Sequence, residues 1–140
     1  MKIKVTILVD PTPRAKPLHA VSGGKVIAYT PEKTRVAKIR IETRIQDALL
    51  EKGIWFSEGM PIRMEATFYR LKPKSTSKRV KLPATKPDWD NYAGLLTDAL
   101  EKYVYYNDSQ ITTAVIRKRF GSPPRIELML NDDNEVPDWF

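Results

Sequence analysis

The sequence predicts one α+β domain, in which a mixed β-sheet is combined with two main helices. Several segments alternate apolar and polar residues, as half-buried strands do, and two longer segments repeat apolar residues at helical spacing. The chain of 140 residues is long enough for one domain with a single core. We assign residues 1–130 to this domain and residues 131–140, which hold four acidic side chains, to a C-terminal tail.

Three strands are expected in the first half of the chain. Alternation predicts strands at residues 2–9 and 62–69. Residues 10–24 are rich in proline and glycine and are expected to form a loop, followed by a short strand at residues 25–29. The side chains expected to face the core are Ile3, Val5, Ile7 and Val9 in the first strand and Ile62, Met64, Ala66 and Phe68 in the later one.

Two helices are expected. The first should run from Pro31 to about Lys52, because a Thr-Pro pair is a favourable helix start and Gly53 is a favourable end. The second should begin near Asp90, with Asp90 or Asn91 as its cap. Both segments place apolar residues on one face, so both are expected to lie against the sheet.

The last two strands are expected at residues 110–120 and 125–130. Between them lies Gly121-Ser-Pro-Pro124, a sequence typical of turns. The short connection predicts that the two strands pair as a β-hairpin.

The residue types that are missing exclude several kinds of active site. The chain has no cysteine, which excludes disulfides, zinc–thiolate sites and cysteine nucleophiles. Its only histidine is His19, so histidine-rich metal sites and HNH-type nuclease sites are also excluded. Enzymatic chemistry would therefore depend on carboxylates, lysines or tyrosines, with a metal held by oxygen ligands.

The positive charge of the chain is concentrated in one segment. The formal net charge is +7, and residues 70–86 contain seven basic side chains and no acidic one. Outside this segment, 17 basic residues balance 17 acidic ones. The segment suggests a polyanionic partner, most simply a nucleic acid backbone, with a solvated flexible loop as an equal alternative. Its basic residues are Arg70, Lys72, Lys74, Lys78, Arg79, Lys81 and Lys86.

No apolar run approaches the roughly 20 residues that a membrane-spanning helix needs. Residues 1–9 alternate between apolar and polar and lack the cleavage site of a secretory signal. We therefore expect a cytoplasmic protein with no membrane partner.

Three aspartates are candidates for a metal site. Asp88 and Asp90 lie two residues apart where a loop enters the second helix, and Asp108 follows just beyond the far end of that helix. Converging carboxylates would repel one another without a divalent cation, and magnesium prefers such oxygen ligands. A magnesium ion there would activate water for attack on a phosphodiester. The alternatives are structural, since aspartates often cap helices and Asn-Asp is a common turn sequence.

The order of these motifs resembles the RusA family of Holliday junction resolvases. Lys86-Pro-Asp-Trp-Asp-Asn91, Asp98-Ala-Leu100 and Asn107-Asp-Ser-Gln-Ile111 are similar to the central signature of that family. Pro11-Thr-Pro-Arg-Ala-Lys-Pro17 and Tyr29-Thr-Pro-Glu-Lys-Thr34 are similar to its N-terminal loop and helix start. The similar pieces follow one order along the chain.

The resemblance implies a homodimeric endodeoxyribonuclease that binds four-way DNA junctions and makes paired nicks with Mg2+, or with Mn2+ in its place. It carries the catalytic and metal-binding roles over to Asp88, Asp90 and Asp108. Such proteins act in DNA recombination and repair and are often encoded by prophages. The residues expected to contact DNA are Arg14, Lys16, Lys72, Lys74, Lys78, Arg79, Lys81, Lys86, Arg117, Lys118 and Arg119.

Two positions depart from the family pattern. Gly94 stands where the family usually has a lysine that assists catalysis, and Asn107 replaces the first aspartate of an Asp-Asp pair. Two alternatives to a resolvase therefore remain: a protein of the same fold that binds junctions with weak or no cleavage, and a basic interaction protein with no metal. Asp98, in the Asp-Ala-Leu motif, is expected to be structural because it faces a different direction from Asp90.

Overall fold

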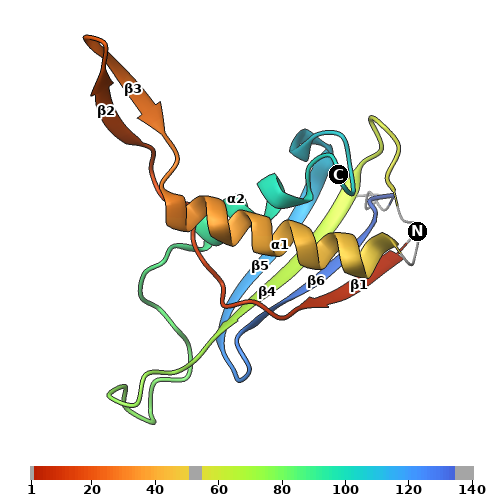
Figure 1. Cartoon of the computed structure of the whole chain (residues 1–140). Helices are drawn as coiled ribbons and strands as arrows, with labels where there is room; N and C mark the ends of the chain where they lie inside the picture. The colour runs from red at the N-terminus through yellow and green to blue at the C-terminus, as the bar shows by residue number, and fades with distance from the viewer. Residues whose placement is uncertain (1, 51–54, 135–140) are drawn as a thin grey trace, which may run out of the picture.

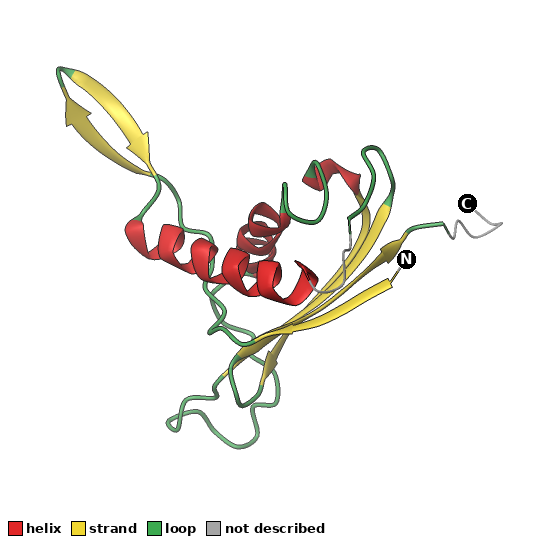
Figure 2. Ribbon diagram, turned by 45° about the vertical axis from the view of Figure 1, so that its right-hand side comes forward, coloured by secondary structure: helices red, strands yellow, loops and turns green. Residues whose placement is uncertain are grey.

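The computed structural model describes residues 2–50 and 55–134. Its elements are β1 (Lys2–Ile7), β2 (Leu18–Ser22), β3 (Lys25–Tyr29), α1 (Glu32–Leu50), β4 (Ile62–Arg70), α2 (Trp89–Leu100), the 3-10 helix η1 (Asp108–Gln110), β5 (Ile111–Phe120) and β6 (Arg125–Asp132). Four strands form a mixed sheet in the order β1-β6-β4-β5, and α1 and α2 lie on one of its faces (Figures 1 and 2). The α+β fold expected from the sequence is confirmed.

The core lies between the sheet and the two helices. β4 is a central strand, paired with β5 on one side and β6 on the other, and every second residue of it is buried. Each helix adds one apolar face, as the spacing of its residues predicts. The buried core residues of these elements include Ile3, Val5, Ile7, Ile41, Ile45, Leu49, Ile62, Met64, Ala66, Phe68, Tyr92, Leu95, Leu96, Ala99, Leu100, Ile126, Leu128 and Leu130.

The predicted hairpin of the last two strands is wrong. β4 lies between them, parallel to β5 and antiparallel to β6. The turn after β5 closes around the end of β4, where the Gly121 N–H donates to the Arg70 carbonyl at 3.0 Å. A turn sequence indicates that the chain reverses, but it carries no information about a third strand between the two that it joins. β5 therefore lies at an edge of this sheet, and α2 contacts it.

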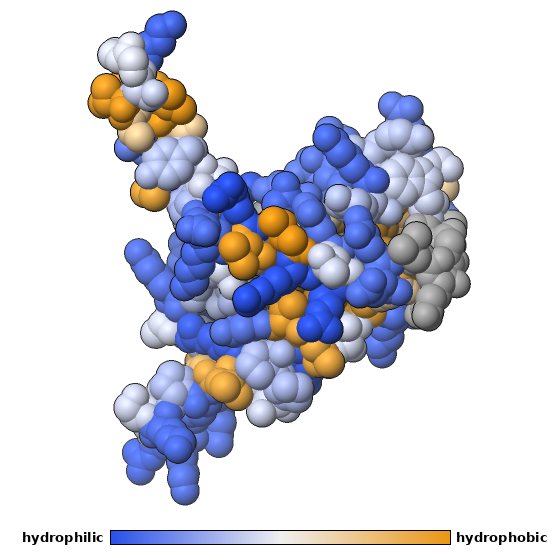
Figure 3. All heavy atoms as spheres, in the orientation of Figure 1, coloured by the Kyte–Doolittle hydropathy of each residue, from blue (hydrophilic) through white to orange (hydrophobic). Residues whose placement is uncertain are grey.

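Part of the predicted loop at residues 10–24 is also a strand. Leu18–Ser22 pairs with β3, and every residue of this hairpin is exposed. Gly23 and Gly24 form its turn with positive φ angles of 58° and 76°, as a type I′ hairpin turn requires. Neither face of β2 is buried, so burial imposes no alternating pattern that would reveal it. Figures 1 and 3 show the hairpin projecting from the core with apolar side chains on its surface.

The helix boundaries differ slightly from those expected. The predicted end of the first helix, at Lys52 and Gly53, lies outside the described residues. The second helix begins at Trp89 with Asp88 as its N-cap, rather than near Asp90. Among the described residues, no helix is both long and apolar enough to cross a membrane.

The start of the expected acidic tail belongs to the sheet. β6 continues to Asp132, and the Asp133 carboxylate accepts hydrogen bonds from the hydroxyls of Thr112 and Thr113 at 2.6 and 2.8 Å. These hydrogen bonds favour the charged form and hold the pKa of Asp133 below its usual value. The rest of the tail, residues 135–140, lies outside the described part of the chain.

Candidate active site

Asp90 and Asp108 reach the same hollow from two parts of the chain. The hollow has a volume of about 260 Å³ and lies between α2 and the edge of the sheet. Asp90 is in the first turn of α2, and Asp108 begins η1 directly before β5. Two of the three predicted aspartates are thus brought together. The other lining residues are Met64, Trp89, Ala93, Gly94, Thr97, Ile111, Ala114 and Ile116.

The start of α2 positions Asp90. The buried face of the helix, which includes Tyr92, Leu95 and Leu96, packs on the sheet and sets the rotation of the helix. Asp90 and Gly94 are four residues apart, so they lie on the same side of the helix, one turn from each other. The positive end of the helix dipole stabilises a carboxylate in this first turn.

Gln110 positions Asp108. Its side chain is buried, and its Oε1 accepts hydrogen bonds from the N–H groups of Tyr106 and Asn107 at 2.9 and 3.1 Å. Its Nε2 donates to two carbonyls of residues 57–60, at 2.8 and 3.1 Å. These four bonds join the turn that carries Asp108 to the segment before β4. The sequence signal for this anchor is the glutamine of the Asn-Asp-Ser-Gln motif, whose role the motif alone does not reveal.

The departure at Asn107 leaves this turn intact. Asn107 is the N-cap of η1, and its Oδ1 accepts a hydrogen bond from the Ser109 N–H at 2.8 Å. Aspartate and asparagine cap helices about equally well, because both offer the same side-chain oxygen. An aspartate at this position would therefore make the same bond, and the exchange has no structural cost.

Asp88 lies at the N-cap of α2, one residue before Trp89, which lines the hollow. It is exposed and is not itself among the lining residues. Aspartate at an N-cap normally accepts a hydrogen bond from the first turn of the helix, but the Asp88 side chain makes no such bond. Its carboxylate is therefore not used to cap the helix.

Two basic side chains hold the backbone just before Asp88. The Lys118 ammonium donates to two carbonyls of residues 85–87, at 2.7 and 2.8 Å. Arg70 donates to a third carbonyl of this segment, at 2.9 Å. Lys118, predicted to contact DNA, thus also fixes the path by which the chain enters α2.

The donors in the hollow fit a magnesium ion. Within residues 2–50 and 55–134, no three histidine, cysteine or acidic side chains are grouped closely enough to form a complete metal site. Magnesium does not need a complete protein cage, since it usually takes one or two carboxylates and fills its remaining positions with water and substrate phosphate. The carboxylates of Asp90 and Asp108 are hard oxygen donors of this kind.

The basic segment is a loop that leaves the sheet after β4 and returns to α2. Lys72 donates to the Val80 carbonyl at 2.6 Å, which closes the loop on itself. Figure 1 shows that the loop and the β2–β3 hairpin both project from the end of the molecule at which α1 and α2 begin. The exposed basic residues of the loop are Lys74, Lys78, Arg79, Lys81 and Lys86.

The structure separates the three basic residues predicted on β5. Lys118 is opposite buried Phe68, on the face of the sheet that carries the helices and the hollow. Arg117 and Arg119 alternate to the other face. There Arg117 forms an ion pair with Glu65 at 3.5 Å, and a hydrogen bond from Arg63 to Glu65 is the main reason that the Glu65 pKa is lowered.

Arg14 and Lys16 lie in the segment between β1 and the projecting hairpin, beside α2. The Arg14 N–H donates to the Asn91 carbonyl at 2.9 Å, and its guanidinium donates to the Asp98 carboxylate at 3.4 Å. Lys16 is exposed, and both basic residues line a second hollow together with Asp98. Asp98 thus faces the second hollow and does not line the hollow of Asp90 and Asp108, which agrees with the different direction expected for it.

Comparison with known proteins identifies the family of this chain. The family model for Endodeoxyribonuclease RusA matches residues 9–131, which include the three aspartates and the basic loop. The uncharacterized protein YqaN of Bacillus subtilis (strain 168) is 30% identical over 140 residues, covering 93% of this chain and 96% of that protein. The resemblance found in the motifs is confirmed, and the chain belongs to the RusA family of endodeoxyribonucleases.

Proposed function

We propose that the protein is a metal-dependent endonuclease that resolves four-way DNA junctions by paired nicks in recombination and repair. The observation that carries this proposal is the pair Asp90 and Asp108, which reach one hollow from separate segments. Family membership supports cleavage of DNA. A homodimer in the cytoplasm would supply the two symmetric sites that paired nicks require.

The carboxylates would serve as metal ligands. Asp90 and Asp108, with Asp88 beside them, would hold magnesium or manganese. The bound cation would lower the pKa of a water molecule and offset negative charge on the phosphodiester. The packed start of α2 positions the backbone of Asp90, and the Gln110 anchor positions the turn that carries Asp108. This arrangement suits hydrolysis of a phosphate ester better than chemistry that needs a protein nucleophile.

The basic loop would bind the DNA backbone. It ends at Asp88, so the chain passes directly from this loop into α2, which lines the hollow. Arg14, Lys16 and Lys118 would add positive charge on the helix side of the sheet. Arg117 and Arg119 face the opposite side and would contact a different arm of the junction.

Nicking of a synthetic four-way junction tests this proposal. The junction is compared with a linear duplex of the same sequence, in magnesium, in manganese and in chelator. We expect metal-dependent nicks in the junction and none in the duplex. A protein that neither binds nor cuts the junction would overturn the proposal.

The absence of a lysine at position 94 favours a second candidate, a junction-binding protein without cleavage. Tight junction binding with no nicks in either metal would support that candidate. The two functions share the fold and the basic loop and differ only in the chemistry of the hollow.

Reversing three charges of the basic loop should weaken junction binding and flatten its salt dependence. In Lys74→Glu/Lys78→Glu/Lys81→Glu, each lost phosphate contact should reduce the slope of log K against log salt by about 0.9. Lys72 is left unchanged because it closes the loop. Binding is measured by fluorescence anisotropy in chelator between low and high salt.

The matched control carries the same three charge reversals on the exposed face of α1, in Lys33→Glu/Arg40→Glu/Arg44→Glu. Both variants change the net charge equally, so the difference between them reports the position of the charges. Equal slopes of log K against log salt for the two variants would show that the loop does not contact the DNA.

A further inference from the structure

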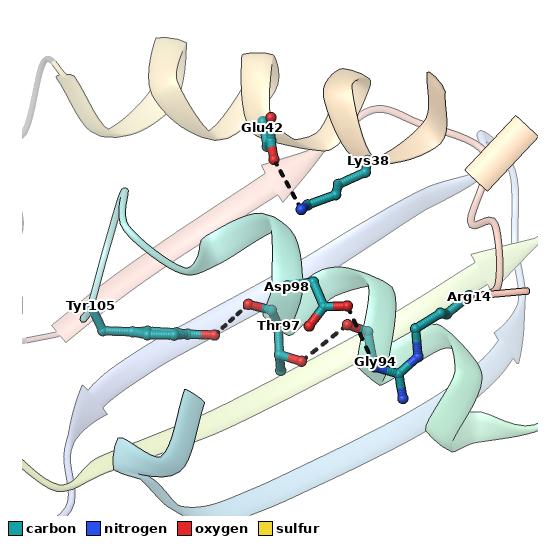
Figure 4. Close-up of polar contacts among 7 residues, drawn as sticks. All are labelled: Arg14, Lys38, Glu42, Gly94, Thr97, Asp98 and Tyr105. Atoms are coloured by element: carbon teal, nitrogen blue, oxygen red, sulfur yellow. Dashed lines mark hydrogen bonds and ion pairs between the residues drawn. The ribbon is translucent and has the colours of Figure 1, made fainter. Parts of the chain in front are cut away.

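Because Gly94 has no side chain, the Arg14 side chain can occupy the space beside α2 at this position. A Cβ atom at position 94 would lie 2.6 Å from Cζ of Arg14 and 2.7 Å from its Nη2, closer than such atoms approach. Figure 4 shows the guanidinium beside Gly94 and Asp98 on α2. With glycine at this position the guanidinium can lie directly against the helix, one turn from Asp90.

Two contacts hold Arg14 there. Its N–H donates to the Asn91 carbonyl, which fixes the backbone of the loop on the first turn of α2. Its Nη1 donates to Asp98 at 3.4 Å, while half of the side chain remains exposed. A guanidinium has five N–H donors in a planar fork, and this contact uses one of them. Donors therefore remain for an anion that enters from solvent.

We propose that Arg14 supplies the positive charge that a lysine at position 94 supplies in the family pattern, and that it binds a DNA phosphate that enters the hollow lined by Asp90 and Asp108. The inference rests on the proposed function, since it assigns a role within the same site. Gly94 lines the hollow of Asp90 and Asp108, and the Arg14 guanidinium, which lines the second hollow, lies against the same glycine, so the two hollows meet at position 94. Arg14 would then compensate for the missing lysine. The positive charge would come from the segment between β1 and β2 instead of from α2.

The chemistry favours a phosphate as the ligand of Arg14. Two carboxylates repel a phosphodiester, and a neighbouring cation offsets that repulsion. A guanidinium pairs with phosphate through two parallel hydrogen bonds, which orient the phosphate as well as attract it. The ion pair with Asp98 is half exposed and therefore weak, so the guanidinium can exchange it for a phosphate.

A charge-relocation experiment tests this proposal in the full-length protein. Arg14→Met removes the charge and keeps much of the length, and Arg14→Met/Gly94→Lys returns a charge to the position that it has in the family pattern. Nicking of the four-way junction is measured under single-turnover conditions. We expect Arg14→Met to lower the rate about 100-fold, the usual effect of losing one donor to a developing anion. The double variant should recover most of that loss.

Junction binding in chelator gives a second readout that does not depend on cleavage. Arg14→Met should reduce the salt slope by about 0.9, the value for one phosphate contact, and the double variant should restore it. Arg44→Met, on the exposed face of α1, is the matched control and should leave both rate and slope unchanged. Thermal unfolding of each variant shows that it is folded.

The outcomes separate this inference from the proposed function. If the wild type nicks junctions and Arg14→Met does so equally well, the inference is wrong and the function stands. If the double variant recovers neither rate nor slope, Arg14 acts only through the structure of its loop, and the inference is again wrong. If the wild type does not nick, the proposed function fails, and the salt slopes alone decide whether Arg14 binds phosphate.

Discussion

Replacing Asp90 or Asp108 with asparagine should reduce junction nicking by more than about 100-fold. Each substitution keeps the size of the side chain and removes the negative charge that attracts a divalent cation. Changes to residues that only support metal ligands cost about 10- to 100-fold, so loss of a direct ligand should cost more. Junction binding in chelator should be unchanged or slightly tighter, because the removed charge repels phosphate.

The rates are measured under single-turnover conditions, and magnesium binding is measured by calorimetry. Asp47→Asn, on the exposed side of α1, is the matched control and should behave as the wild type. If neither Asp90→Asn nor Asp108→Asn changes nicking or magnesium binding, the assignment of the site is wrong.

Asp88→Asn tests the third aspartate separately. The Asp88 side chain makes no cap hydrogen bond that the substitution could remove, and asparagine is accepted at an N-cap as well as aspartate, so the melting temperature should not change. We expect reduced nicking, because the Asp88 carboxylate is not used to cap α2 and would turn toward the bound cation. Unchanged nicking would limit the metal ligands to the two aspartates that line the hollow.

The strands and helices that build the core could be predicted because burial imposes a period on the sequence. Every second residue of β4 is buried, and the alternation of that segment is correspondingly clear. The hairpin strand β2 has no buried face and therefore no such pattern. The pairing of β5 with β4 depends on contacts between segments that are distant in the sequence, and the turn sequence at Gly121 does not indicate these contacts.

The candidate site likewise has one part that the sequence predicts and one part that it does not. The convergence of Asp90 and Asp108 follows from local geometry, because a helix of this length crosses the sheet and the turn after it returns the chain. The contact of Arg14 with Gly94 does not follow, since it joins segments far apart in the sequence and one partner has no side chain. From the sequence alone Gly94 is only a missing lysine, whereas in the structure the Arg14 guanidinium lies where a side chain at position 94 would be.

Gln110→Leu should destabilise the protein by about 3 kcal/mol and lower its melting temperature by roughly 6–12 °C. Leucine has a similar size but makes none of the four hydrogen bonds of Gln110. Two backbone N–H groups and two carbonyls then lose their partner next to a buried position. The turn that carries Asp108 is no longer joined to residues 57–60, so nicking should fall even where the variant is folded.

Gln110→Glu tests the two hydrogen bonds that Gln110 donates separately from the two that it accepts. Glutamate keeps the oxygen that accepts from Tyr106 and Asn107, but it places a second oxygen against the carbonyls of residues 57–60. Because that oxygen repels the carbonyls, the variant should unfold at least as readily as Gln110→Leu above neutral pH and should regain stability as acid protonates the carboxylate. Thermal unfolding across this pH range measures both effects. Wild-type melting temperatures for both variants would show that the turn at Asp108 is held by other contacts, such as the hydrogen bond from the Asp108 N–H to the Glu101 carboxylate at 3.2 Å.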